Sequence, residues 1–544
     1  MFLFDNPVLQ RELLGNLRSP RSFVLLAAYQ LFLAGIVLAA WPADGRLDLT
    51  TNPPSARKLV DLFFLGQYVI ASLMAPSFAA GAIAGEKERQ TYEMLLASPL
   101  RPAAIVSGKL IASLTHLGLL IIASLPIIVL CLPLGGVSVY EVLAAYTGLV
   151  VSVILFGTIA LFCGSHFSRT GSALVVSYLI ILPLVMGAVL FWRMLAADGQ
   201  LRLQLTLLVI PAYALAAVIL MAADAAGRML YPPDFGSEGK PVIDPEREAA
   251  EAVGLVIQPD QFPDRLFAPP KKQELMPDGT NPVYDKELHS EIFSQGTLML
   301  RLVIQISMLL AIPLMGVFLF WLIDRCIWFP AYAIIFNLLV GPVFLAGSMT
   351  GERERQTLDL LLTTPLSPWQ ILSGKFVVGF RVSGVLTAFL LWPLVLASLL
   401  NNVFWGNWAA VLGMFAIVFA ACLVNSVVAL TASLFQRRTV VALVTTYATL
   451  LVLYVGPPAA EALATLFDFS PEAIAGVRRT GIGSPFSALA ALPLDEQLNL
   501  SADDGPANVG DLAIVGGYFA FAATLIGGAY AAMFARLSGR RDGI

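Results

Sequence analysis

A charged segment that occurs twice is the feature that most constrains the fold of this chain. Residues 85–109 read GEKERQTYEMLLASPLRPAAIVSGK, and residues 351–375 read GERERQTLDLLLTTPLSPWQILSGK. The copies align without a gap and share 15 of 25 residues. About half of the chain separates them, far more than the roughly 20 to 50 residues of a solenoid repeat. The segment therefore marks a duplicated half-protein, and whatever it does is done twice.

The composition is that of a membrane protein. Of the 544 residues 58% are hydrophobic and only 13% are charged, about half the charge content of a soluble domain. Many apolar stretches reach the roughly 20 residues that cross a bilayer core as a helix. We expect an all-α polytopic membrane protein with about 12 transmembrane helices, arranged as two parallel six-helix repeats. The expected spans are 22–41, 60–84, 103–133, 140–164, 171–193, 203–223, 302–323, 327–350, 369–399, 408–434, 439–456 and 511–535.

The basic residues predict the orientation. With the N-terminus inside, 25 of the 33 lysines and arginines fall on the inner side, as the positive-inside rule requires. An even number of spans then puts both termini and both charged segments in the cytosol. We expect a multi-pass protein of the inner (plasma) membrane.

Three parts follow from the repeat. Residues 1–223 form the first transmembrane half and residues 281–544 the second. Residues 224–280 hold nine prolines and eleven acidic residues, which predicts a largely irregular cytosolic linker with one short helix near 245–253. Residues 456–510 are expected to lie outside the membrane, with short helices that dip into the outer interface.

The charged segments predict two short amphipathic helices on the inner membrane surface, at 86–97 and 352–363. We expect Gly85 and Gly351 to end the preceding spans, so that Glu86 and Glu352 start new helices where the dipole favours a carboxylate. The lysines that end the segments, Lys109 and Lys375, are expected to extend toward the lipid phosphates.

A solvated interfacial helix is the plain interpretation of such a segment. Both copies nevertheless keep Glu-x-Glu-Arg-Gln-Thr, while the neighbouring spans have diverged. This favours a helix that docks a protein over one that faces lipid. The duplication also extends outward, since Glu12-Leu13 recurs as Glu287-Leu288 and Arg169-Thr170 recurs as Arg438-Thr439.

The pattern E-[KR]-E-R-x-T-x-[ED]-x-L-L-x-[ST]-P-L-x-P-x-x-I-x-x-G-K resembles the signature of the permease subunits of type-2 ABC exporters. The start Asn-Pro-Val-x-x-x-Glu-Leu before the first span is similar to that family as well. So is a six-span half with a helix between spans two and three. The family usually has glycine before the threonine, where this chain has Gln90 and Gln356.

The resemblance implies that the helix between spans two and three is a coupling helix, which docks in a groove of a separate ATPase subunit. Two copies imply two ATPase subunits for each chain. The partner would use ATP and Mg²⁺, and this chain would bind no cofactor. The residues given this role are Glu86, Glu88, Arg89, Gln90, Thr91 and Glu93 in the first copy and Glu352, Glu354, Arg355, Gln356, Thr357 and Asp359 in the second.

The sequence itself indicates no enzyme. It contains no G-x-x-x-x-G-K-[ST] pattern, and the Ser-Gly-Lys at 107–109 and at 373–375 is followed by Leu110 or Phe376, which cannot hold magnesium. Three histidines and four scattered cysteines predict neither a metal nor a nucleophilic site. No nucleic-acid partner is expected.

Four polar residues inside expected spans are candidates for a transport pathway. Gln30 and Gln305 are equivalent in the repeat, and each forms either a helix–helix hydrogen bond or part of a path between the halves. His116 and Arg381 lie about two turns into the third spans. The plainer expectation is a packing role for His116 and an inward-reaching side chain for Arg381.

Two other functions remain open on these residues. Twelve spans in two parallel halves is also the major-facilitator layout of secondary transporters. That family's Asp-Arg and glycine-rich loop is missing here. Intramembrane carboxylates are nearly absent, since Asp61, Asp224 and Asp324 lie near span ends. The chain could instead anchor an ATP-driven envelope machine without transporting a substrate, with an accessory envelope protein as a further partner. The substrate cannot be identified from the sequence.

Overall fold

The computed structural model separates the chain into two compact units, Met1–Glu248 and Ala249–Ile544, and each is treated by itself. The structure describes only part of the chain. The described residues are 7–17, parts of 26–37, 53–89, 91–131, 138–167, 170–194, 199–230, 281–288, 309, 312–321, 326–354, 356–401, 404–405, 407–437, 439–466, 470–492 and 509–541.

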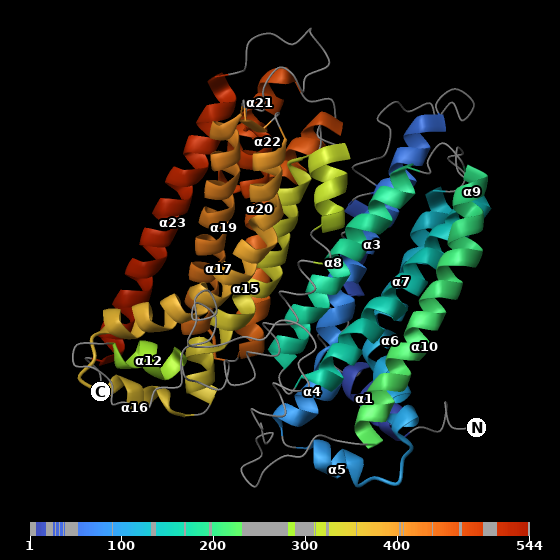
Figure 1. Cartoon of the computed structure of the whole chain (residues 1–544), viewed down its shortest axis with the longest axis horizontal. Coiled ribbons are helices and arrows are strands. Elements are labelled where there is room, and N and C mark those ends of the chain that lie inside the picture. Colours follow the sequence, from blue (N-terminus) through green and yellow to red (C-terminus); the bar gives the residue numbers. More distant parts are fainter. Residues whose placement is uncertain are drawn as a thin grey trace. The chain divides into compact units, whose positions relative to one another are not determined.

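Unit 1 is built of helices. They are α1 (Pro7–Leu17), α3 (Pro53–Ala79), α4 (Gly81–Glu88), α5 (Tyr92–Leu96), α6 (Pro102–Cys131), α7 (Val139–His166), α8 (Thr170–Met194), α9 (Gly199–Gln204), the π-helical turn η2 (Leu205–Val209) and α10 (Ile210–Leu230). Helix α3 packs against α6, α7 and α8, while α10 packs against α6 and α7 and α1 lies on α6. Helices α1, α4 and α5 lie at one end of this bundle and α9 at the other (Figure 1).

Unit 2 repeats this arrangement. Its helices are α12 (Pro282–Leu288), the π-helical turn η4 (Gly316–Trp321), α15 (Trp328–Glu354), α16 (Leu358–Leu362), α17 (Pro368–Leu400), α19 (Trp408–Phe435), α20 (Thr439–Leu466), α21 (Pro471–Arg479), the 3-10 turn η6 (Thr480–Gly483), α22 (Pro485–Ala490) and α23 (Val509–Arg541). Helix α15 packs against α17, α19 and α20, while α23 packs against α17 and α19 and α12 lies on α17. Helices α12 and α16 lie at one end of the bundle, and α21 and α22 at the other (Figure 1).

Local sequence signals explain several helix starts. The Ser138 hydroxyl accepts a hydrogen bond from the backbone N–H of Glu141, and the Glu141 carboxylate accepts one from the backbone N–H of Ser138. Ser367 and Gln370 form the same reciprocal pair at the start of α17, and Pro368 occupies the first helical position. Such capping boxes satisfy backbone N–H groups that a helix start leaves without partners.

Within the described residues, nine helices are long and apolar enough to cross a membrane. They are Phe63–Glu88, Pro102–Val129, Val139–His166, Gln200–Met229, Trp328–Glu354, Pro368–Leu400, Trp408–Phe435, Val441–Glu461 and Leu512–Gly539. Shorter apolar helices, Ala173–Val189 and Ile312–Trp321, fall within the expected fifth and seventh spans. The expected first span, 22–41, is described only in part. The all-helical membrane fold is confirmed, and the number twelve stays a prediction.

Two boundaries differ from those expected. Helix α10 continues to Leu230, so residues 224–230 are helical and do not belong to an irregular linker. The short helix expected near 245–253 lies outside the described residues. Helix α20 continues past 456 to Leu466 with two prolines inside it, because contacts with α21 and α22 support its last turns.

Part of the segment 456–510 packs against the helices of unit 2. Helix α22 contacts α19, α20 and α23, and its Ala488 and Leu489 are fully buried, which removes their apolar surface from water. The position of this segment at the outer membrane interface stays a prediction.

Candidate functional site

The charged segments do not fold into the two helices expected at 86–97 and 352–363. Helix α4 runs through Gly85 to Glu88, and only the five residues of α5 form a separate helix. Helix α15 likewise runs through Gly351 to Glu354 before α16 begins. The expected breaks at the two glycines are wrong, since glycine weakens a helix without ending it.

A threonine closes the turn between the two helices in each copy. The backbone N–H of Thr91 donates to the Glu86 carbonyl oxygen at 3.0 Å, and its hydroxyl donates to the Glu86 carboxylate. Thr357 does the same with Glu352, at 2.8 Å for the backbone bond. Glu86 and Glu352 therefore bind into the turn that follows them, and they do not start a new helix.

Gln356 in this turn has a φ of 59°, the left-handed conformation that favours glycine. Glycine is the residue usual at this position in the family that the segment resembles. The departure noted in the sequence therefore falls on a residue with a strained backbone. The equivalent Gln90 lies outside the described residues.

Each segment ends in a buried lysine that joins three elements. The Nζ of Lys109 is 2.9 Å from Glu12 of α1 and 3.0 Å from Glu86, and the lysine side chain is only 2% exposed. The expectation that this lysine extends toward the lipid phosphates is therefore wrong. A buried ammonium needs close carboxylates to compensate for lost hydration.

The second copy repeats this ion-pair cluster. Lys375 pairs with Glu287 of α12 and, at 3.4 Å, with Glu352, while its side chain is 1% exposed. It also donates to the carbonyl oxygen of Ser348 at 2.9 Å. Lys286 adds a more exposed partner to Glu352 at 2.9 Å. The first amphipathic helix of each half is thus bound to the charged segment of the same half.

Glu88 and Glu354 cap the start of a later helix of the same unit, α8 in unit 1 and α20 in unit 2. The Glu88 carboxylate accepts from the backbone N–H of Thr170 at 2.9 Å and from its hydroxyl at 3.0 Å. Glu354 accepts from the same groups of Thr439 at 2.8 and 3.0 Å. These carboxylates satisfy the start of α8 and of α20, where the helix dipole also favours negative charge.

In each charged segment, the basic residue between the two glutamates binds the C-terminal end of another helix, α7 in unit 1 and α19 in unit 2. Lys87 donates to the carbonyl oxygens of Ser165 and Phe167 at 2.5 and 3.3 Å. Arg353 donates to those of Leu434, at 3.0 Å, and Gln436. Carbonyls at a helix C-terminus lack intrahelical donors and favour a positive charge.

The outward faces of α5 and α16 carry exposed side chains. Glu93 and Asp359 are exposed, and each is followed by an apolar residue, Met94 at 76% and Leu360 at 69% exposure. Arg89 and Gln356 are exposed beside them. Arg355 lies outside the described residues.

The inward faces of the same helices are buried. Tyr92 packs with Ile83, Ile105 and Met229, and burial raises the pKa of its hydroxyl. Leu358 and Leu362 join a cluster of unit 2 that includes residues of α15, α17, α19 and α23. Each short helix is therefore an exposed ridge whose underside contacts several transmembrane helices.

Three of the four pathway candidates lie within the described residues. The ring of His116 lies 5.9 Å from that of Phe78. Arg381 donates to the Tyr284 hydroxyl at 3.1 Å, which ties α17 to α12. Gln30 is half-buried, and Gln305 lies outside the described residues. Their role in a pathway stays a prediction.

Sequence reasoning missed the partners of the charged segment. Glu12, Glu287, Thr170 and Thr439 complete the site, and all four recur in the repeat together with the segment. That parallel recurrence is the signal that could have found them. No group of three potential metal ligands occurs within the described part of the chain.

Comparison with family models decides the family. Residues 42–323 match a model described as ABC-2 family transporter protein, which covers more than half of the chain. The chain belongs to the ABC-2 transporter family. A second ABC-2 family transporter model matches residues 271–489, so two ABC-2 membrane domains stand in tandem. The protein is thus the permease of an ABC transporter with its two halves fused. A search of curated proteins finds none that matches.

Proposed function

We propose that this ABC-2 permease exports its substrate across the inner membrane, driven by ATP that separate ATPase subunits hydrolyse. One subunit docks on α5 and one on α16, so each chain engages two ATPase subunits or one dimer. The observation that carries this proposal is the pair of short exposed helices, held by the same set of contacts in both units.

The contacts of the charged segment could transmit a displacement of α5 to the transmembrane helices. The segment around α5 is bonded to α1, α6, α7 and α8 through Glu12, Lys109, Ser165 and Thr170. A displacement of α5 must therefore move the ends of these helices together. Closure of the ATPase on ATP and Mg²⁺ would bias the two halves between inward and outward access, as in other two-state transitions.

The structure divides the proposed docking residues into two groups. Glu86, Glu88, Thr91 and their second-copy equivalents bind within the permease, so they support the docking helix. Arg89, Glu93, Gln356 and Asp359 face outward and are proposed to touch the ATPase, together with Met94 and Leu360. The roles of Gln90 and Arg355 follow from the resemblance alone.

Charge reversal on the outward faces tests the docking. We expect Glu93→Lys combined with Asp359→Lys to abolish the ATP hydrolysis that co-purifies with the tagged permease from native membranes. The free energy of unfolding of the purified permease should change by no more than about 0.5 kcal/mol, as for an ordinary surface substitution. A melting curve checks this. Each single variant should lose part of the activity, because one docking helix remains.

Glu472→Lys provides the control, because Glu472 is exposed at the opposite end of unit 2. Its effect on co-purified ATP hydrolysis should be nil. Undiminished co-purification in the double variant would overturn the docking proposal. Substrate accumulation in inverted vesicles with ATP separates export from a purely mechanical role as a membrane anchor.

A further inference from the structure

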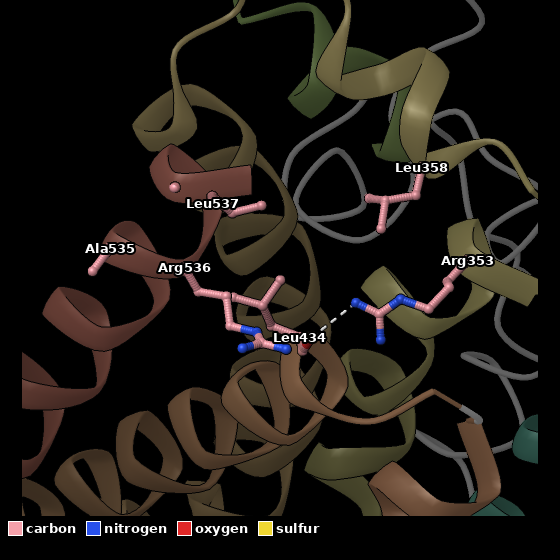
Figure 2. A pocket seen from close by; sticks show the side chains of 7 residues that line it. Arg353, Leu358, Leu434, Ala535, Arg536 and Leu537 are labelled. Carbon is pink, nitrogen blue, oxygen red and sulfur yellow. Dashed lines mark hydrogen bonds between the residues drawn. The ribbon is translucent and has the colours of Figure 1, made fainter. Parts of the chain in front are cut away.

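A cavity lies beneath α16 at the end of unit 2. Its volume is about 430 Å³, and it lies between the last turns of α15, α19 and α23. Most of the lining is apolar, and two arginines complete it (Figure 2). The lining residues are Arg353, Leu358, Leu434, Ala535, Arg536, Leu537 and Gly539.

The two guanidinium groups enter the cavity from opposite walls and point toward one another across Leu434 (Figure 2). Arg353 is oriented by its bonds to the carbonyl oxygens of Leu434 and Gln436. Arg536 lies over the ring of Phe435, with its guanidinium carbon 5.0 Å from the ring centroid. Within the described residues, Arg536 forms no ion pair with a carboxylate.

In unit 1 a larger side chain stands at the position equivalent to Leu358. Tyr92 stands at the position of Leu358 in the repeat, and its ring lies 5.4 Å from the Nζ of Lys87, the equivalent of Arg353. The ring packs against Ala225 and Met229 of α10. An aromatic side chain therefore occupies in unit 1 the space that a leucine leaves open in unit 2.

The sixth helices differ in charge at this level. Ala225 and Met229 of α10 correspond to Met533 and Leu537 of α23, because each pair packs under its short helix. In this register Arg228 corresponds to Arg536. Arg228 forms an ion pair with Asp224 at 3.4 Å, whereas Ala532 stands at the place of that aspartate.

We propose that this cavity binds the phosphate headgroup of an anionic phospholipid from the leaflet next to α16. Two converging guanidinium groups match the oxygens of a phosphodiester. The apolar lining and the exposed Phe435 and Phe534 beside it suit the acyl chains. Arg437, close in sequence to the lining residue Leu434, is exposed and adds positive charge, which attracts anionic lipid.

The bound lipid would act on one docking helix only. Leu358 belongs to α16 and lines the cavity, so the occupant supports α16 from below, as Tyr92 supports α5. Anionic lipid is thus a structural part of the second docking helix and has no counterpart in the first. This inference rests on the geometry of unit 2 and holds whether or not an ATPase docks there.

Native mass spectrometry of the purified permease tests the site, with dioleoylphosphatidylglycerol and dioleoylphosphatidylcholine as probes. We expect the wild type to bind phosphatidylglycerol more tightly than phosphatidylcholine. Arg536→Gln should weaken phosphatidylglycerol binding about tenfold, the factor that the loss of one charge-assisted hydrogen bond produces. Leu358→Tyr should do the same by filling the cavity as Tyr92 does in unit 1.

Arg228→Gln is the matched control and should leave the lipid preference unchanged, because Asp224 already neutralises Arg228. Since Arg536 is exposed, its variant is expected to fold, and a melting curve checks this for all three variants. Equal phosphatidylglycerol binding by wild type and Arg536→Gln would overturn the proposal. Displacement of the lipid by millimolar inorganic phosphate would also overturn it, since the site would then be one for a free anion.

Discussion

The middles of the two units differ, although their ends are alike. In unit 2 a chain of buried hydrogen bonds crosses five side chains. The Asn337 amide donates to Ser383 and Thr387 at 2.7 and 2.8 Å and accepts from Asn425 at 2.8 Å. Tyr454 donates to Asn425 at 2.7 Å. Four transmembrane helices, α15, α17, α19 and α20, are joined in this way.

Unit 1 has apolar side chains at all five equivalent positions, and all five are buried. In the register of the repeat these residues are Ala71, Leu117, Ile121, Phe156 and Val185. The two halves therefore solve the same packing problem differently. At these five positions unit 1 relies on close apolar contact, whereas unit 2 has a polar network that is stable only when all its members are satisfied.

The contrast teaches which part of the fold the duplication has kept. The buried lysine ion pairs, the glutamate caps and the threonine turns recur at the end that carries α5 or α16. The five interior positions described above have diverged. A shared end fits a task performed twice by the same kind of partner.

The largest effect is expected from substitutions that remove the buried ion pairs present in both units. Lys109→Met and Lys375→Met each leave two carboxylates without their buried cation, so each should destabilise the permease by about 3–5 kcal/mol. The two losses should be similar, because each lysine is buried in the equivalent ion-pair cluster of its own unit. Melting of the detergent-solubilised protein measures them.

Lys286→Met is the control for this pair, since its side chain is 60% exposed and its loss should cost about 1 kcal/mol or less. A loss as small for Lys375→Met would show that the buried cluster does not hold the segment.

A smaller effect sharpens the contrast between the interiors. Asn337→Leu keeps the volume but removes the partner of Asn425, Ser383 and Thr387, so it should cost about 1–3 kcal/mol. Ala71→Asn places an unpaired amide in the apolar interior of unit 1 and should cost a similar amount. If thermal melting finds Ala71→Asn neutral, the two interiors are not as different as their side chains suggest.

The smallest effect tests a contact present in both interiors. The Tyr178 hydroxyl donates to the Leu73 carbonyl oxygen at 2.7 Å, and Tyr447 donates to that of Leu339 at 2.6 Å. Tyr178→Phe and Tyr447→Phe should each lower stability by about 1 kcal/mol. Clearly unequal melting shifts would mean that the repeat register does not extend into the membrane interior.

Much of the fold could be read from the sequence. Apolar stretches long enough to span a membrane fall at nine of the expected places, and the duplicated segment predicted two equivalent sites. The exact bounds of α5 and α16 could not be read, because Glu86 and Glu352 look like helix-starting residues in one dimension. Only the hydrogen bonds from Thr91 and Thr357 place them in the last turn of the preceding helix.

By itself, the sequence determined that the protein is a duplicated helical membrane protein with two charged inter-span segments. Hydropathy and repetition are properties of the chain order, so no partner from elsewhere in the fold is needed to see them. The tertiary structure alone decided which acidic residues face inward and which face outward. Lys109 finds Glu12 at a separation of 97 residues, and Glu88 finds Thr170 at a separation of 82. A charge becomes a structural bond or an exposed docking residue according to what the packed helices bring beside it.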